Sequence, residues 1–178
     1  AGEATITVSD PTQPSVSASV AVRVSAAGPA SQAGSWRWDV HGWWYRYEDG
    51  SYPSDTTLVL DGATYRFDAA GYMRTGWVNE RGVWYYHHAS GAQAKGWVLD
   101  GVHWYYMDPD TGAMVTGWLQ VGGTWYYLSP ADGAMVTGWF KDGDHWFYLH
   151  HGSGAMATGW VRIYLKWYQF NEAGQLIS

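Results

Sequence analysis

The sequence predicts an all-β fold, a solenoid of stacked β-hairpin repeats preceded by a short two-stranded β segment. Composition is the first indication, since 14 Trp, 14 Tyr and 23 Gly occur among 178 residues, far from the aliphatic-rich usage of an average domain. We therefore expect a largely aromatic core. Periodicity is the second, because Gly-Trp pairs return at intervals of 20, 21, 21 and 21 residues, beginning at residues 76, 96, 117, 138 and 159. Units this small cannot bury an aromatic face alone, so stacking is expected.

The N-terminal part of the chain has a different pattern. Residues 4–10 and 16–24 alternate apolar and polar side chains, which predicts two strands joined by a connection that contains proline. An isolated hairpin is marginal in water, so this pair is expected to complete a larger sheet, and it resembles the last two strands of a bacterial immunoglobulin-like domain. The predicted organisation is this segment over residues 1–25, a Gly- and Pro-containing linker over 26–35, and the repeat solenoid over 36–178.

Each repeat unit reads as strand, tight turn and strand. A second tryptophan follows each Gly-Trp pair at the same intervals, at positions 84, 104, 125, 146 and 167. Between the two tryptophans lies a Gly-bearing tetrapeptide such as 80–83 or 99–102, which supplies the positive φ of a hairpin turn. A looser turn such as 108–112 and the connector 113–116 then lead to the next Gly-Trp pair.

The outer units are irregular, as expected for the ends of a repeat array. In the first unit Trp36 and Trp44 are eight residues apart, close to the seven that separate Trp77 from Trp84. The next unit has Thr64 where Trp84 aligns and Arg66 in place of the second tyrosine. Elsewhere Gln93 and Leu176 replace the methionine, and Gln169 replaces a tyrosine.

The aromatic residues have a spacing that suits a binding site. Residues two apart in a strand share a face, so Trp104 and Tyr106 point one way while Tyr105 and Met107 point the other. The two tryptophans of one unit and a tyrosine of the next are expected to form a three-walled box, with the connector methionine as its floor. Such a box suits a quaternary ammonium, which has no hydrogen to donate and is attracted to ring faces. The alternative interpretation is that the rings serve only as packing residues of the core. Three or four rings per repeat, however, exceed what a thin hairpin stack needs for burial.

At this point the residues resemble a known family. The pattern GWxxxxGxWYYxxxxxGxMxTGW is similar to the choline-binding, or cell-wall-binding, repeat of autolysins and surface proteins of Gram-positive bacteria. Residues 44–53 and 61–77 resemble the opening of an autolysin's choline-binding module in particular. The resemblance implies a secreted, cell-wall-associated module in which choline of teichoic acids sits between adjacent hairpins and which anchors a larger exported protein.

Carried over position by position, the resemblance implies three complete sites. Each combines two tryptophans with a tyrosine and a methionine of the next unit: Trp77, Trp84, Tyr106 and Met114; Trp97, Trp104, Tyr127 and Met135; Trp118, Trp125, Tyr148 and Met156. Trp139 and Trp146 are added as ligand-binding residues of a groove that Gln169 and Leu176 weaken. The same-face argument favours the second tyrosine of each pair, with Tyr105 or Tyr126 as the alternative.

Other ligands and roles remain open. A related repeat family in glucosyltransferases and clostridial toxins binds glucans, so a glycan is an alternative ligand. A spacer or oligomerisation arm that binds nothing is another alternative. The expected partner is choline-bearing teichoic acid or another cell-wall polymer or glycan. A homodimer formed through the C-terminal repeats is a further alternative.

Several classes of function are not expected. The net charge of −6 is dispersed and no basic patch is present, which argues against nucleic acid. No stretch approaches the roughly 20 apolar residues of a membrane span. Residues 1–30 lack a signal-peptide pattern, so we expect the chain to be a piece of a longer protein. Cysteine is absent, the pairs His87-His88 and His150-His151 would point to opposite strand faces, and the aspartates lie in turns. We therefore expect neither a metal, a cofactor nor a catalytic site.

Overall fold

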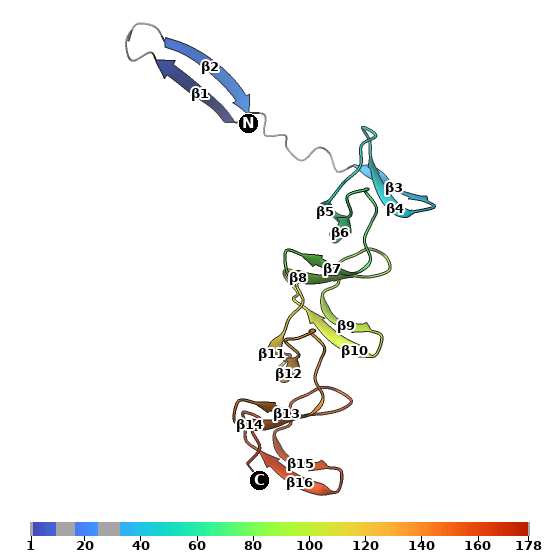
Figure 1. Ribbon diagram of the computed structural model, residues 1–178, viewed down its shortest axis with the longest axis vertical. Coiled ribbons are helices and arrows are strands. Elements are labelled where there is room, and N and C mark those ends of the chain that lie inside the picture. The colour runs from blue at the N-terminus through green and yellow to red at the C-terminus, as the bar shows by residue number, and fades with distance from the viewer. Residues whose placement is uncertain (1, 10–16, 25–32, 178) are drawn as a thin grey trace.

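The computed structural model describes residues 2–9, 17–24 and 33–177. Within these ranges the secondary structure consists of sixteen strands, each paired with one neighbour in a two-stranded antiparallel sheet. No helix long and apolar enough to cross a membrane occurs in this part of the chain. The predicted all-β solenoid of hairpin repeats is confirmed (Figure 1).

The N-terminal strands β1 (Gly2–Ser9) and β2 (Ser17–Val24) pair antiparallel, with Gly2 opposite Val24. The two expected strands are therefore present. Residues 26–32 of the expected linker lie outside the described residues, and its last two residues already belong to β3, which begins at Gly34. The assignment of β1 and β2 to an immunoglobulin-like domain stays a prediction.

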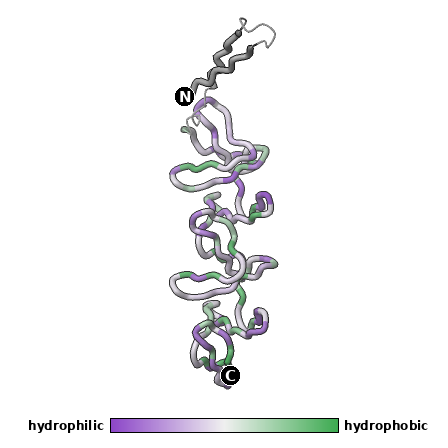
Figure 2. The backbone as a smooth tube through the Cα atoms, turned by 90° about the vertical axis from the view of Figure 1, so that its left-hand side faces the viewer, coloured by the Kyte–Doolittle hydropathy of each residue, from purple (hydrophilic) through white to green (hydrophobic). Residues whose placement is uncertain are grey.

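Seven hairpins make up the repeat array. Their strands are β3 (Gly34–Asp39) with β4 (Gly42–Tyr47), β5 (Thr56–Leu60) with β6 (Ala63–Phe67), β7 (Gly76–Glu80) with β8 (Val83–His87), β9 (Gly96–Asp100) with β10 (His103–Met107), β11 (Gly117–Val121) with β12 (Thr124–Leu128), β13 (Gly138–Asp142) with β14 (His145–Leu149), and β15 (Gly159–Ile163) with β16 (Lys166–Phe170). The hairpins follow one another along the long axis of the array (Figures 1 and 2).

Two-residue turns close the hairpins, as the Gly-bearing tetrapeptides predict. In β7–β8 the turn residues Arg81 and Gly82 have φ of 54° and 89°, which is the conformation that the right-handed twist of a hairpin requires. Gly122 and Gly123 do the same in β11–β12, with φ of 57° and 84°. These turns fix the register in which the two tryptophans of a unit face the same way.

The connector after each hairpin joins it to the hairpin before. The Met114 N–H donates to the Trp84 carbonyl at 2.8 Å, and the Val115 N–H donates to the Tyr106 carbonyl of its own unit at 2.8 Å. The first of these bonds has a counterpart at every junction of the array: Met73 to Trp43, Gln93 to Thr64, Met135 to Trp104, Met156 to Trp125 and Leu176 to Trp146. Since each sheet has only two strands, these backbone bonds hold successive sheets together.

The core differs from the aromatic core that composition predicts. The largest fully buried side chains are Phe67, Met107, Leu128 and Leu149, each at the end of the second strand of its hairpin. Trp84 and Trp104, by contrast, are 43% and 40% exposed. A narrow line of mostly aliphatic residues is enough to fill the centre of a thin hairpin stack, so the surplus of indole rings lies at its surface.

His87 occupies this core line in β8 and is the buried polar residue of the described core. Burial lowers the pKa of its imidazole below the usual 6.5, and the positive charges of Arg66 and His88 act in the same direction. The carbonyl of Gly91, 2.9 Å from Nδ1, and the carboxylate of Glu80 oppose this shift. His87 is consequently neutral in the folded protein near neutral pH.

Replacing His87 should change the pH dependence of stability. Because the folded state disfavours the imidazolium, the unfolded chain takes up the proton first, and stability is lost as the pH falls below about 6.5. A His87→Met variant, which has the residue found in the same place as Met107, should lose less free energy of unfolding than the parent between about pH 7.5 and pH 5.5. Urea unfolding at both pH values measures this difference. Met107→Leu is the matched control, because Met107 occupies the same core place in β10 and neither side chain titrates, so its effect should be the same at both pH values. An equal effect of pH on the two variants would contradict the assignment to His87.

Aromatic grooves as the candidate functional site

A groove between successive hairpins is walled by three aromatic rings. At the junction of β7–β8 with β9–β10, the rings of Trp77 and Trp84 are 6.3 Å apart and nearly perpendicular, at 84°. Tyr105 of the next hairpin stands edge-on to Trp77, with centroids 4.7 Å apart and planes at 71°. Met114 lies in the same cavity, which has a volume of about 750 Å³. Two perpendicular indoles and a phenol thus make a box open on one side.

Strand pairing explains which ring closes each box. In β9–β10 Trp97 lies opposite Tyr106, and Trp104 is two residues from Tyr106, so all three share one face. Tyr105 lies opposite Val98 on the other face. The face with Trp97 and Trp104 walls the groove toward β11–β12, so only the opposite face can reach back to the groove of β7–β8.

The structure therefore places the second tyrosines differently from the favoured prediction. Tyr106, Tyr127 and Tyr148 pack against tryptophans of their own hairpins, at centroid distances of 5.1, 5.1 and 5.3 Å. The rings that line the three predicted grooves are Tyr105, Tyr126 and Phe147. The same-face argument identified residues that share a hairpin face correctly. It did not take into account that the closing ring must come from the opposite face of the following hairpin.

The two other predicted boxes have the same construction. Trp97 and Trp104 are 6.4 Å apart at 87°, with Tyr126 at 4.9 Å from Trp97 and Met135 in the cavity of about 270 Å³. At the next junction Trp118 and Trp125 are 6.4 Å apart at 83°, and the cavity is about 370 Å³. Its remaining lining side chains include Phe147, 4.9 Å from Trp118, and Met156.

A third hairpin completes each groove. The turn after β12 contributes Ala131 and Asp132 to the groove of Trp77 and Trp84, two hairpins earlier in the chain. Gly133 in this turn has φ of 80°, and a Cβ there would overlap the sulfur of Met114. Glycine is thus needed both for the turn and for the close approach of the methionine. Each site is assembled from three consecutive hairpins.

A further aromatic groove lies at the start of the array and was not predicted. It is lined by Trp36, Trp43, Tyr65 and Met73, with a volume of about 350 Å³. Trp36 and Tyr65 are 4.9 Å apart at 63°. The partner of Trp36 is Trp43 and not, as expected from the sequence, Trp44, and the seven-residue spacing to Trp43 is the one that the other units have.

The rings of Trp139 and Trp146 keep the same geometry, 6.4 Å apart at 83°. Tyr168 takes the place of the closing ring, 4.9 Å from Trp139. Leu176 occupies the methionine position, and its N–H donates to the Trp146 carbonyl at 2.8 Å. This junction therefore has the three rings without the methionine.

Carboxylates give the groove of Trp77 and Trp84 a negative character. The Asp100 carboxylate accepts a hydrogen bond from the Trp77 indole N–H at 2.9 Å, and Asp132 lines the cavity. Burial, followed by the charges of Asp132 and Asp100, raises the pKa of the Tyr105 phenol. Hydrogen bonds from Ser129 and the Ala134 N–H lower the pKa of Asp132, which stays ionised. The groove thus combines ring faces with negative charge.

The charge is not the same at every groove. Asp142 accepts from the Trp118 indole N–H at 2.8 Å, as Asp100 does from Trp77. The groove of Trp97 has the apolar Val121 at the corresponding place in β11. In residues 33–177, no group of three or more His, Asp or Glu is arranged to hold a metal ion.

The fold and the grooves together define a class of protein: a β-hairpin repeat module with an aromatic cage at four of the described junctions. Family comparison gives the particular family. Residues 75–116 and 115–158 each match the family model described as a choline-binding repeat, so this part of the chain consists of choline-binding repeats. The resemblance noted from the sequence is thereby confirmed.

Solved structures of choline-binding proteins are similar over most of the array. Choline-binding protein F from Streptococcus pneumoniae, determined with a tetrasaccharide-pentapeptide analogue of peptidoglycan, is 37% identical with a TM-score of 0.75, over 82% of this chain and 52% of its own. CbpJ from Streptococcus pneumoniae TIGR4 is 37% identical with a TM-score of 0.76, over the same shares. The cell wall endolysin from phage Cp-1, complexed with choline, is 42% identical with a TM-score of 0.54, over 70% of this chain and 37% of its own. This chain spans about half the length of the first two. None of the curated proteins matches it.

Removing the Asp100 carboxylate, which accepts the hydrogen bond of the Trp77 indole, should lower the stability of the protein measurably. Asp100→Ala leaves the indole N–H without its acceptor, and we expect a loss of about 1 kcal/mol in the free energy of unfolding, with a change in tryptophan emission. Urea unfolding followed by fluorescence measures both. Asp144→Ala, at an exposed turn residue, is the matched control and should change stability by less than about 0.5 kcal/mol. Equal effects of the two substitutions would show that the Trp77 bond contributes nothing.

Proposed function

We propose that this chain is a non-catalytic module that binds choline groups of a bacterial cell-wall polymer in the aromatic grooves and anchors a larger exported protein. The observation that carries the proposal is the cage of three rings and one methionine, which the described residues form at four junctions. The choline complex of the phage Cp-1 endolysin, a similar structure, supports this ligand. We infer that the polymer is a teichoic acid and that the module is located at the cell wall.

Ring geometry and charge favour a cation over a sugar in these grooves. A quaternary ammonium gains roughly 0.5 to 2 kcal/mol from each ring face, so two or three walls reach the roughly 4 kcal/mol of millimolar binding. The carboxylate of Asp132 adds attraction for a cation. A sugar would need hydrogen-bond partners, whereas the cavity of Trp118, Trp125 and Phe147 is lined almost wholly by apolar side chains.

Several weak sites on one rigid array would act together. A polymer that carries many choline groups can occupy more than one groove, and each further contact is intramolecular once the first has formed. Millimolar sites then give stable attachment to the wall. A glycan-binding module and a spacer that binds nothing are the competing functions.

Choline titration followed by tryptophan fluorescence distinguishes these functions. We expect saturable quenching with a millimolar midpoint and a stoichiometry of four choline molecules per chain, one for each cavity with three rings and a methionine. Glucan oligosaccharides should leave the tryptophan signal unchanged. A response to glucan without one to choline would replace the proposal by the glycan function, and silence to both would favour the spacer.

Loss of one indole should remove one site. Trp104 lines a single cavity, that of Trp97 and Met135, so Trp104→Ala should reduce the choline stoichiometry by one and leave the other affinities unchanged. Isothermal titration calorimetry measures both quantities. Trp167→Ala is the matched control, because this exposed indole lines none of the described cavities. Loss of two ligands in Trp104→Ala would mean that neighbouring grooves share a ring.

A further inference from the structure

One junction of the array has a polar groove where four others have an aromatic one. It lies where β5–β6 meets β7–β8, with a volume of about 360 Å³. Hydroxyl, amide and charged side chains make up most of its lining: Thr57, Thr64, Glu80, Tyr85, His87, Gln93, Lys95, Asp110 and Thr111.

This groove has the same backbone construction as the aromatic ones. The Gln93 N–H donates to the Thr64 carbonyl at 2.8 Å, as Met114 does to Trp84. The turn residues Asp110 and Thr111 come from two hairpins later, as Ala131 and Asp132 do for Trp77. The junction is therefore a complete groove in which the side chains differ.

Three side chains of this groove differ from those at the equivalent positions of the aromatic grooves. From strand register, Thr57 stands at the place of Trp77, Thr64 at that of Trp84, and Gln93 at that of Met114. Tyr85 keeps the place of Tyr105. With both indoles replaced by threonine, no cage remains for a quaternary ammonium.

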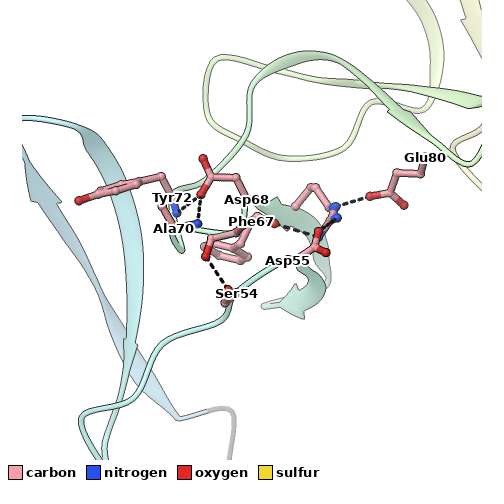
Figure 3. Close-up of polar contacts among 9 residues, drawn as sticks. Ser54, Asp55, Phe67, Asp68, Ala70, Tyr72 and Glu80 are labelled. Atoms are coloured by element: carbon pink, nitrogen blue, oxygen red, sulfur yellow. Dashed lines mark hydrogen bonds and ion pairs between the residues drawn. The ribbon is translucent and has the colours of Figure 1, made fainter.

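The charges at this groove are mostly paired with one another. The Arg66 guanidinium forms ion pairs with both Asp55 and Glu80, the latter a lining residue (Figure 3). The Lys95 ammonium donates to the Asp110 carbonyl at 3.3 Å. The two cations Arg66 and Lys95 thus accompany the lining carboxylates Glu80 and Asp110, while the third carboxylate, Asp55, is exposed to solvent and paired with Arg66. No strong excess of charge of either sign faces the groove, which is compatible with a ligand without net charge.

Open polar groups and an open ring face remain for a ligand. Among the described residues, the hydroxyls of Thr57 and Thr64 and the side-chain amide of Gln93 have no hydrogen-bond partner in the protein, although each can both donate and accept. The closing rings Tyr65, Tyr105, Tyr126, Phe147 and Tyr168 each stand edge-on to an indole. Tyr85 has Thr57 in that place, so its ring face is free of such a contact within the described array.

We propose that this polar groove binds a neutral sugar residue. A sugar ring offers adjacent hydroxyls that donate and accept, which matches the threonine and glutamine groups, and an apolar C–H face, which matches the Tyr85 ring. These hydroxyl and amide groups can exchange hydrogen bonds to water for hydrogen bonds to the sugar. The site shares no lining residue with the choline grooves, so sugar binding can be tested independently of choline binding.

The test is an NMR titration of the ¹⁵N-labelled chain with methyl glycosides of glucose, galactose, N-acetylglucosamine and N-acetylgalactosamine, with choline present at saturation. We expect at least one glycoside to shift the backbone amides of Thr64, Gln93 and Lys95 with a millimolar Kd. In Thr57→Val/Thr64→Val, which keeps side-chain shape and strand preference, the affinity should fall at least about fivefold. Thr158→Val, at an exposed connector residue outside the groove, should bind as the parent does.

The folding of the double variant is checked by its amide spectrum, in which resonances of residues outside the groove should keep their positions. The proposal is overturned if no glycoside shifts these amides at concentrations of tens of millimolar, or if the double variant binds as the parent does. Binding of a glycoside that is seen without choline and is lost at choline saturation would also overturn it, since the sugar would then occupy an aromatic groove. Inorganic phosphate is the remaining probe, and shifts caused by phosphate alone would indicate an anion site at Lys95 instead.

Discussion

One backbone hydrogen bond, from the connector of each hairpin to the carbonyl of the hairpin before, underlies the architecture of the array. It runs from Met114 to Trp84 at 2.8 Å and recurs at the other five junctions from Trp43 onward. Two-stranded sheets are marginal alone in water, so the array depends on such joins between hairpins. The bond also brings the connector side chain under the second-strand side chain, which creates the groove. Since it uses only backbone atoms, the same bond forms at the groove lined by threonine as at those lined by tryptophan.

This independence separates stability from binding. The buried line of Phe67, Met107, Leu128 and Leu149 holds the stack together, while the half-exposed indoles wall the grooves. Groove side chains can therefore differ among junctions without loss of the fold, since Thr64 occupies in β6 the position that Trp84 has in β8. The chain can accordingly combine aromatic and polar grooves on one scaffold, and the ligand of each groove follows from a few side chains at equivalent positions.

Much of the fold could be predicted from the sequence, because its determinants are local. The spacing of the Gly-Trp pairs and the Gly-bearing turns predicted the hairpins, and the structure brings together the tryptophans and methionines that were grouped at three grooves. The ring that closes each groove in the structure differs from the favoured one. Strand alternation predicts that Tyr105 and Tyr106 lie on opposite faces, but it does not predict which face meets the preceding hairpin. The contribution of Asp132 was missed for a similar reason: it comes from two hairpins away and depends on the path of the stack.

The three-hairpin construction has a consequence for how the module can vary. β9–β10 presents Trp104 to the groove that follows it and Tyr105 to the groove before it. The turn after it gives Asp110 and Thr111 to the polar groove, one junction earlier still. Exchange of a whole hairpin would thus alter three sites at once, whereas a change at Thr57 or Thr64 alters one. Point substitution at the tryptophan positions is the route by which one groove can change its ligand while its neighbours keep theirs.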